Sequence, residues 1–150
     1  MSPIGSIVQP AQHSFLAPRF EDAEVVDAMR MGVLSCPPDT SLREAARTMA
    51  TYRIHCLLVG EPGGDAPLAV VSDLDLAAAA GGDADSRTVR EVAGTEPLTV
   101  AGDEKLSRAA QLMAEHGVSH LIVVAPASGH PVGILSTLDL AEALAWGGIS

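Results

Sequence analysis

Hydrophobic residues recur at helical spacing in two stretches of the chain. They stand at positions i, i+3, i+4 and i+7 of each stretch, which places them on one face of an α-helix. Polar residues that favour helix starts precede each stretch, at 39–41 and 102–104. The pattern predicts two helices with buried stripes, formed by Leu42, Ala45, Ala46 and Met49 in the first and by Leu106, Ala109, Ala110 and Met113 in the second.

Short apolar runs bounded by turn residues predict the strands. In each half of the chain a short strand precedes the helix, a two-stranded hairpin follows it, and a second apolar helix follows the hairpin. This order, strand, helix, strand, strand, helix, predicts an α/β (α+β) fold. The predicted strands are 33–36, 54–59, 68–71, 98–100, 118–124 and 131–135, and the closing helices are 74–80 and 138–146.

The two halves are copies of one another. A shift of 64 residues (89 − 25 = 64) aligns residues 25–80 with 89–144 without a gap, and identical residues recur along the whole alignment. An internal repeat of this size indicates two copies of one α/β unit. A Gly- and Asp-rich segment at 81–86 is a linker short enough to force the halves together. The predicted organisation is an N-terminal extension at 1–20, a first repeat at 21–82 and a second repeat at 83–150.

A repeated motif lies where the last strand of each copy becomes a helix. Ser72 and Asp75 stand there in the first copy, and Ser136 and Asp139 stand there in the second. A hydroxyl and a carboxylate three residues apart can cap the helix, and each cap contributes about 1 kcal/mol. The same two groups can also grip a hydroxyl-rich ligand. The residues alone leave both interpretations open.

Composition limits the partners of the chain. Of its 150 residues, 47% are hydrophobic and 3% aromatic, which predicts a packed core and disfavours a stacking surface for single-stranded nucleic acid. Its 9 basic and 19 acidic residues give a net charge of −10, which repels phosphate backbones and anionic lipid. The sequence contains neither an apolar run of membrane-spanning length nor a signal-peptide pattern. We expect no nucleic-acid partner, no membrane association and a cytoplasmic location.

Residue types that often carry chemistry show no catalytic or metal-binding pattern here. Cys36 and Cys56 form no C-x-x-C pair, and we expect buried thiols rather than a cross-link. The five histidines lack zinc spacing, and Asp73 beside Asp75 has no third ligand nearby. No nucleophile elbow, P-loop or H-E-x-x-H motif occurs. We therefore expect neither a bound metal nor an enzymatic activity.

In this order the motifs resemble tandem cystathionine-β-synthase (CBS) repeats, also called a Bateman module. The matching pieces are residues 25–29 ahead of the first strand, residues 37–42 with the Ala-Ala-x-x-Met helix, and the Ser-x-x-Asp-Leu ending of each copy. The resemblance covers residues 21–146. It implies two pseudo-symmetric βαββα repeats packed sheet to sheet, with two clefts between them for adenosine-type ligands.

The resemblance also implies which residues bind the ligand. The carboxylate of each Ser-x-x-Asp turn takes the ribose hydroxyls, and the serine lies near the ribose or the phosphate. Residues of the first strand and of the start of the second strand line the base, and Arg53 can supply charge for a phosphate. The predicted ligand-binding residues are Ser35, Arg53, Ile54, His55, Ser72, Asp75, Thr99, Val118, Ser119, His120, Ser136 and Asp139.

Two differences break the symmetry between the copies. Ala69 stands where the second copy has Gly133, which makes a backbone approach tighter in the first copy. Arg53 stands where the second copy has Gly117, so this cationic group has no counterpart. We expect two unequal clefts, at least one of which binds a ligand.

The leading hypothesis is a stand-alone CBS-pair protein that acts as a regulatory sensor. Its ligand is predicted to be an adenine nucleotide (AMP, ADP or ATP) or a related adenosyl compound, with no catalytic cofactor. We expect a homodimer and an unidentified regulated protein as partners. The alternative is an interaction or dimerisation scaffold with vestigial clefts. The expected packing anchors are Phe15, Leu16 and Phe20 in the N-terminal extension and Trp146 in the last helix.

Overall fold

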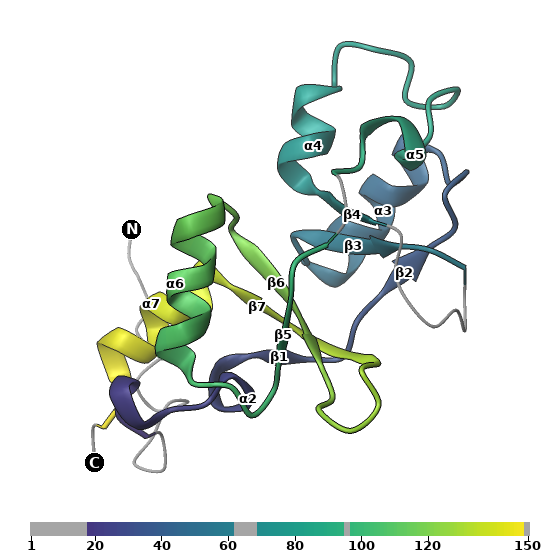
Figure 1. Cartoon of the computed structure of the whole chain (residues 1–150). Helices are drawn as coiled ribbons and strands as arrows, with labels where there is room; N and C mark the ends of the chain where they lie inside the picture. Colours follow the sequence, from purple (N-terminus) through teal and green to yellow (C-terminus); the bar gives the residue numbers. More distant parts are fainter. Residues whose placement is uncertain (1–17, 62–68, 95–96, 149–150) are drawn as a thin grey trace. The chain divides into compact units, whose positions relative to one another are not determined.

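The computed structural model describes residues 18–61, 69–94 and 97–148, and the chain forms two compact units (Figure 1). Unit 1 combines the described residues up to Met31 with those from Thr99 onward, and unit 2 contains the described residues between Gly32 and Leu98. Phe15 and Leu16 lie outside the described residues. Each unit contains a sheet and its own helices, so the predicted α/β fold class is confirmed.

Unit 2 is built on a three-stranded sheet with the order β2-β3-β4. Strand β2 runs parallel to β3, and β4 runs antiparallel to β3. Helices α3 and α4 contact each other and the sheet, and α5 places Val89 in the same hydrophobic core. The elements are β2 (Ser35–Cys36), α3 (Leu42–Tyr52), β3 (Cys56–Val59), β4 (Ala69–Ser72), α4 (Asp73–Ala78) and α5 (Val89–Val92).

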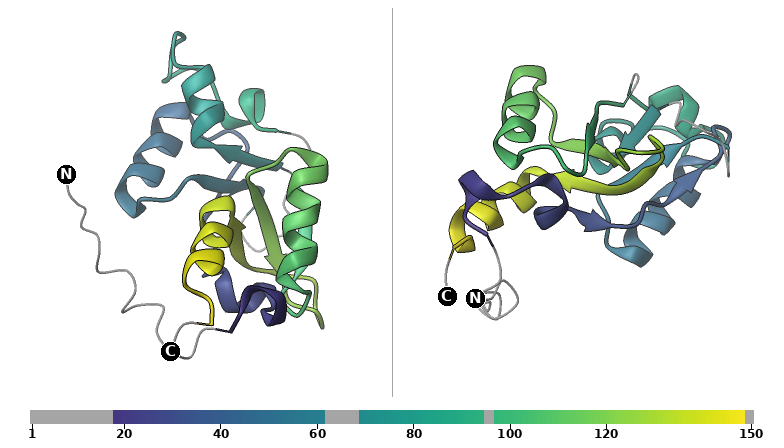
Figure 2. Two further views of the ribbon diagram at one scale, coloured as in Figure 1. Left: turned by 90° about the vertical axis from the view of Figure 1, so that its left-hand side faces the viewer. Right: turned by 60° about the horizontal axis from the view of Figure 1, so that its bottom comes forward.

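Unit 1 is built on a four-stranded sheet with the order β1-β7-β6-β5 (Figures 1 and 2). Helices α6 and α7 contact each other, and each packs against a strand of this sheet. The short helices η2 and α2 pack against α6, and α2 also contacts α7. The elements are η2 (Phe20–Asp22), α2 (Val25–Ala28), β1 (Arg30–Met31), β5 (Thr99–Ala101), α6 (Leu106–His116), β6 (His120–Val124), β7 (Pro131–Ser136) and α7 (Thr137–Trp146).

The segment that leads into each repeat packs with the other repeat. Helix α2 and strand β1 precede the first repeat, yet they pack with the second repeat in unit 1. Helix α5 precedes the second repeat and packs with the first repeat in unit 2. An equivalent backbone hydrogen bond holds each leading segment. The N–H of Leu106 donates to Ala23 O (2.9 Å), and the N–H of its equivalent Leu42 donates to Arg87 O (3.0 Å). These bonds satisfy helix N–H groups that would otherwise lack partners.

The segment after α4 is part of unit 2. Arg43 at the start of α3 donates its backbone N–H to Ala84 O, and its Nε lies 2.6 Å from Asp85 Oδ1. The N–H of Glu44 in the same turn is satisfied by Ser41 Oγ at 3.1 Å. The segment at 81–86, predicted as the linker between the repeats, also closes the N-terminus of α3, because Ala84 and Asp85 accept hydrogen bonds from Arg43 in the first turn of that helix.

Gly133 is required where β1 joins the sheet. A Cβ on this residue would lie 2.5 Å from Arg30 O and 2.9 Å from Met29 Sδ. In unit 2 the glycine lies on the docking segment instead of on the sheet strand. Gly94, the equivalent of Arg30, donates its N–H to Val70 O, next to Ala69 on β4. The predicted asymmetry between Ala69 and Gly133 thus reflects how each leading segment docks on its sheet.

The predicted helical stripes form much of the two cores. Leu42, Ala45 and Met49 are buried in unit 2, and their equivalents Leu106, Ala109 and Met113 are buried in unit 1. Ala46 is exposed, so that part of the prediction is wrong, and Ala110 is only partly buried. Both lie at the edge of the stripe, where a helix face turns towards solvent.

Helices α3 and α6 end in the same backbone conformation. Gly117 follows α6 with φ 64°, and Arg53 follows α3 with φ 55°. This left-handed conformation suits glycine and costs other residues about 1 kcal/mol. Arg53 therefore occupies a strained helix end that the second repeat assigns to glycine. Within the described ranges, no helix is long and apolar enough to cross a membrane.

Candidate functional site

Both Ser-x-x-Asp turns form the same capping box. Ser72 Oγ accepts the N–H of Asp75 at 3.1 Å, and Asp75 Oδ2 accepts the N–H of Ser72 at 2.8 Å. In unit 1 the corresponding distances between Ser136 and Asp139 are 3.2 and 2.8 Å. The helix-capping interpretation is therefore confirmed for both turns, at the starts of α4 and α7.

Capping engages only one oxygen of each carboxylate. The Oδ2 atom of Asp139 also accepts the Ser136 hydroxyl at 3.0 Å. In the described part of the chain, no hydrogen bond or ion pair reaches the Oδ1 atom of either Asp75 or Asp139. Asp139 is only 6% exposed, whereas Asp75 is partly buried. A buried carboxylate oxygen without a hydrogen-bond partner destabilises the folded state. Asp139 Oδ1 is therefore a position where a hydrogen-bond donor of a ligand can bind.

The unit 2 turn has an acid and a histidine beside it. Asp73 donates its N–H to His55 O at 2.8 Å, and His55 Nδ1 lies 2.8 Å from Asp73 Oδ2. A carboxylate only accepts, so Nδ1 carries the hydrogen of this bond. Ser72 is the register partner of Cys56, the residue after His55. The structure therefore brings the predicted residues His55, Ser72 and Asp75 to one end of the β3–β4 hairpin, together with Asp73, which was not among them.

The equivalent positions in unit 1 are neutral. Thr137 replaces Asp73 and donates its N–H to Ser119 O at 3.0 Å. Ser119 Oγ is hydrogen-bonded to His120 Nδ1 at 3.0 Å, and His120 is the register partner of Ser136. The predicted residues Ser119, His120, Ser136 and Asp139 thus meet at the end of the β6–β7 hairpin.

The remaining predicted residues lie further along the same elements. Ser35 and Thr99 are exposed on β2 and β5, where they pair with Leu58 and Ile122. Ile54 packs against the hydrophobic core of unit 2, and Val118 is partly buried. Arg53 is exposed at the end of α3.

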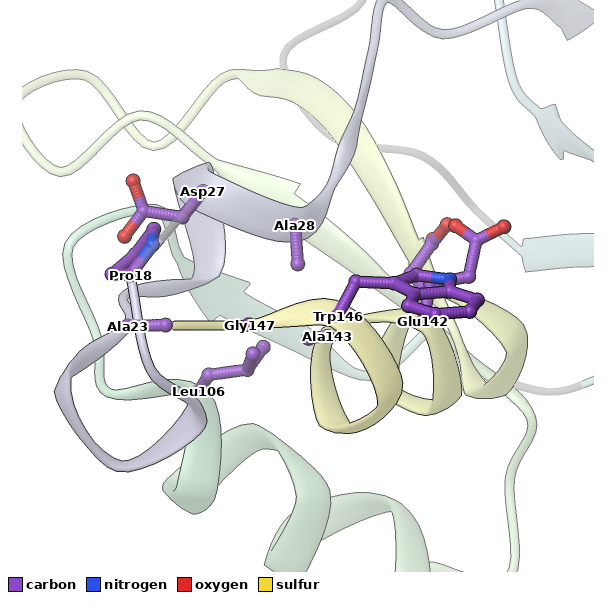
Figure 3. A pocket seen from close by; sticks show the side chains of 10 residues that line it. Pro18, Ala23, Asp27, Ala28, Leu106, Glu142, Ala143, Trp146 and Gly147 are labelled. Atoms are coloured by element: carbon purple, nitrogen blue, oxygen red, sulfur yellow. The ribbon is translucent and has the colours of Figure 1, made fainter. Parts of the chain in front are cut away.

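A small pocket in unit 1 contains Asp139 (Figure 3). Its volume is about 80 Å³, and its lining includes Asp27 and Ala28 from α2 together with Glu142 and Trp146 from α7. Figure 3 shows the Trp146 indole beside Glu142, with Pro18, Ala23 and Asp27 at the other end. Asp27 and Glu142 were not among the predicted ligand-binding residues. A spacing of three residues from Asp139 to Glu142 on one helix was the available signal.

The pocket residues differ between the repeats. Glu142 corresponds to Ala78 and Trp146 to Gly82, 64 positions earlier in the chain. A Cβ on Gly82 would lie 3.2 Å from Arg87 Cδ, so this part of unit 2 has an arginine stem close by. The glutamate and the tryptophan of this pocket therefore have no equivalent in the first repeat.

The two cysteines are buried thiols with raised pKa values. Cys36 and Cys56 are both free and buried, as predicted. Burial, with a smaller contribution from the Asp73 carboxylate, raises the pKa of Cys56 to about 11, and burial also raises the pKa of Cys36. A raised pKa favours the protonated thiol, which is a weaker nucleophile than the thiolate. Among the described residues, no group of three His, Cys, Asp or Glu side chains is arranged to hold a metal ion.

Comparison with known proteins places these features in a family. The CBS domain model matches residues 24–82 and 89–145. The chain is 30% identical over 119 residues to the CBS domain-containing protein YhcV of Bacillus subtilis, which covers 79% of this chain and 84% of that protein. It is 31% identical over 143 residues to a homoserine O-acetyltransferase of Methanocorpusculum labreanum, covering 93% of this chain. The chain spans only 28% of the length of that relative.

A solved structure supports the same fold. The CBS domain pair of protein MJ0100, in complex with 5′-methylthioadenosine and S-adenosyl-L-methionine, superposes with a TM-score of 0.73 at 21% identity. The match covers 82% of this chain and 96% of that chain. Together with the two repeats, their capping turns and the matched residues, it identifies the chain as a tandem pair of CBS domains and a member of the CBS domain family.

Proposed function

We propose that this CBS pair is a regulatory sensor that binds an adenosyl ligand through Asp139, Asp75 or both, and has no chemistry of its own. The observation that carries the proposal is that each capping carboxylate has one oxygen left for a ligand. A carboxylate oxygen accepts hydrogen bonds from vicinal hydroxyls, the group that a ribose presents. The adenosyl compounds bound by the CBS pair of MJ0100 carry this ribose.

The two Ser-x-x-Asp turns are expected to bind the ligand with different affinities. Asp139 is more deeply buried than Asp75, and a hydrogen bond to a buried carboxylate is worth more than one to an exposed carboxylate. Asp73 adds a second carboxylate at the unit 2 turn, where unit 1 has Thr137. We therefore place the stronger ligand site at Asp139, with an adenine nucleotide or another adenosyl compound as ligand.

Calorimetric titration with S-adenosylmethionine, methylthioadenosine, AMP, ADP, ATP and NAD tests this proposal. Asp139→Asn keeps a capping oxygen but removes the charge, and it is expected to weaken the best ligand about 10- to 100-fold, as for the loss of a hydrogen bond to a charged group. Asp75→Asn is expected to have a smaller effect.

Glu91→Gln is the matched control for these variants. Glu91 closes an equivalent capping box with Thr88 at the start of α5, but it is not one of the predicted ligand residues. This variant should keep the wild-type affinity. Absence of binding by every adenosyl compound would instead favour the scaffold alternative.

We further propose that the protein forms a homodimer through the exposed face of α7. Leu138 and Leu144 are 54% and 66% exposed on this helix, and Leu74, the equivalent of Leu138, is 74% exposed on α4. The other exposed residues of α7 are Thr137, Ala141 and Ala145, so the face carries no charge. A second copy presents the same uncharged face, and small side chains allow two helices to approach closely.

Sedimentation velocity tests the dimer. The wild-type chain is expected to sediment as a dimer at micromolar concentration, and the double variant Leu138→Lys, Leu144→Lys as a monomer, because two charges per face would have to be buried. Tyr52→Lys is the control, since Tyr52 is 61% exposed on α3, a helix of the other compact unit. A wild-type monomer, or a variant that remains dimeric, would contradict this interface.

A further inference from the structure

The chain just ahead of Ala23 lies against the end of α7. We call residues 18–22, which include the short helix η2, the N-terminal strap. A Cβ on Gly147, the residue that follows α7, would lie 2.7 Å from Pro18 O and 3.4 Å from Phe20 N. The absence of a side chain at Gly147 therefore lets the backbone of the strap approach this helix closely.

The strap closes one end of the pocket that Asp139 lines. Pro18 and Ala23 belong to the lining, and Figure 3 shows them at the end of the pocket away from Trp146. Asp139 is only 6% exposed, so a ribose that binds its carboxylate has to enter this pocket. The volume is about 80 Å³, whereas drug-sized ligands occupy about 300–1,000 Å³. An adenosyl compound therefore fits only after one wall of the pocket has moved.

The other walls of the pocket are fixed by hydrogen bonds or by burial. Val25 in α2 donates its N–H to Glu104 O at 2.9 Å, and β1, which follows α2, pairs with β7. Leu106 at the start of α6 is fully buried, and α7 carries Asp139 itself. Moving any of these walls would break hydrogen bonds or open the core of unit 1.

The strap is held less firmly than these walls. Asp22 donates its N–H to Arg19 O at 2.9 Å, and Arg19 forms an exposed ion pair with Glu21, so these interactions stay within the strap. Among the described residues, no hydrogen bond or ion pair links residues 18–22 to α6 or α7. Pro18 and Phe20 are partly buried, and the other three residues are exposed. A segment with so few buried contacts opens at a low free-energy cost.

From these observations we propose that the N-terminal strap is an autoinhibitory gate on the unit 1 site, which an adenosyl ligand displaces when it binds Asp139. The proposal rests on the proposed function at this carboxylate and adds how the site is regulated. The closed strap lowers the apparent affinity, because only molecules with an open strap accept the ligand. Binding in turn detaches the chain ahead of Ala23 from α7, which gives the sensor a structural output.

Gly147→Ala tests the gate, because the added Cβ would lie 2.7 Å from Pro18 O and forces the strap away from α7. In calorimetric titrations with the six adenosyl compounds, this variant is expected to bind the best ligand about three- to tenfold more tightly than the wild type. The same Cβ would also lie 2.5 Å from Ala143 O, within α7. Phe20→Ala is therefore a second variant, which loosens the strap without altering the helix and should also tighten binding.

Gly81→Ala is the matched control. Nothing lies within 4 Å of a Cβ at Gly81, so the same substitution should keep the wild-type affinity there. Circular dichroism establishes that each variant is folded before it is titrated. If Gly147→Ala and Phe20→Ala both bind the ligand no more tightly than the wild type, the inference is overturned, while adenosyl binding and the proposed function still stand. Absence of binding by all six compounds rejects both.

Limited proteolysis reports the position of the strap directly. Trypsin cleaves after arginine, and Arg19 lies within the strap. Saturation of the wild type with the best-binding compound is expected to speed cleavage at Arg19 about fivefold or more, because cleavage follows the population of the open form. Cleavage at Arg47, in α3 of unit 2, should not become faster. Gly147→Ala should be cleaved rapidly at Arg19 even without ligand. Cleavage at Arg19 that is unchanged or slower in the saturated wild type would overturn the inference.

Discussion

Replacing Leu121 by alanine is expected to lower the free energy of unfolding by about 3 kcal/mol, within the range of roughly 2–5 kcal/mol for buried leucines. Leu121 lies in the middle of β6 and is fully buried. Its truncation removes apolar contacts and leaves a cavity that the surrounding strands cannot fill, because β6 is held between β5 and β7. Thermal unfolding followed by circular dichroism should show a decrease of about 6–12 °C in the midpoint.

Leu57→Ala is the matched variant in the other repeat. Leu57 is the equivalent of Leu121 and is also fully buried, so a similar loss is expected. The exposed Leu74→Ala is the control, and its effect should stay within about 0.5 kcal/mol. A loss below about 1 kcal/mol for Leu121→Ala would contradict a core centred on β6. If both core variants shift one common transition, the two compact units unfold together.

Gly133→Ala is expected to lower the free energy of unfolding by about 2 kcal/mol, which corresponds to a midpoint decrease of about 4–8 °C. The added Cβ would lie 2.5 Å from Arg30 O and 2.9 Å from Met29 Sδ. The methionine side chain can move aside, but the carbonyl oxygen belongs to β1, which pairs with β7 at this point. Strand β1 therefore has to shift away from the sheet.

Hydrogen exchange localises this effect. The amide protons of residues 29–31 and of the facing part of β7 should lose protection in Gly133→Ala, while those of β3 and β4 in unit 2 should not. Gly81→Ala is the control, because nothing lies within 4 Å of a Cβ at that position. Unchanged protection of β1 together with an unchanged midpoint would show that the close approach at Gly133 is not needed.

The sequence predicted the local structure well where its periodicity was strong. The stripes around Leu42 and Leu106 formed two eleven-residue helices, and the apolar runs between turn residues formed the two hairpins. The Ser-x-x-Asp turns also formed as capping boxes, since a cap depends only on residues three positions apart. These features depend on neighbours in the chain, which the sequence displays directly.

The roles of single residues in the candidate site were less predictable. Ile54 was expected to line a base, which stays a prediction, and the structure adds that its side chain packs against the core of unit 2. Asp73 was set aside as an incomplete metal motif, and it pairs with His55. In both cases the partner lies on another element, so the spacing within one segment carries no information about it.

What the sequence alone determined is the repeat, the order of elements in each copy and the position of both Ser-x-x-Asp turns, because hydrophobic periodicity and capping act over a few residues. Only the tertiary structure decided that α2 and β1 pack with the second repeat, that Gly133 makes room for them, and that Glu142 and Trp146 join Asp139 in one pocket. Those features depend on contacts between segments about a hundred residues apart, and such contacts are fixed by packing rather than by local pattern.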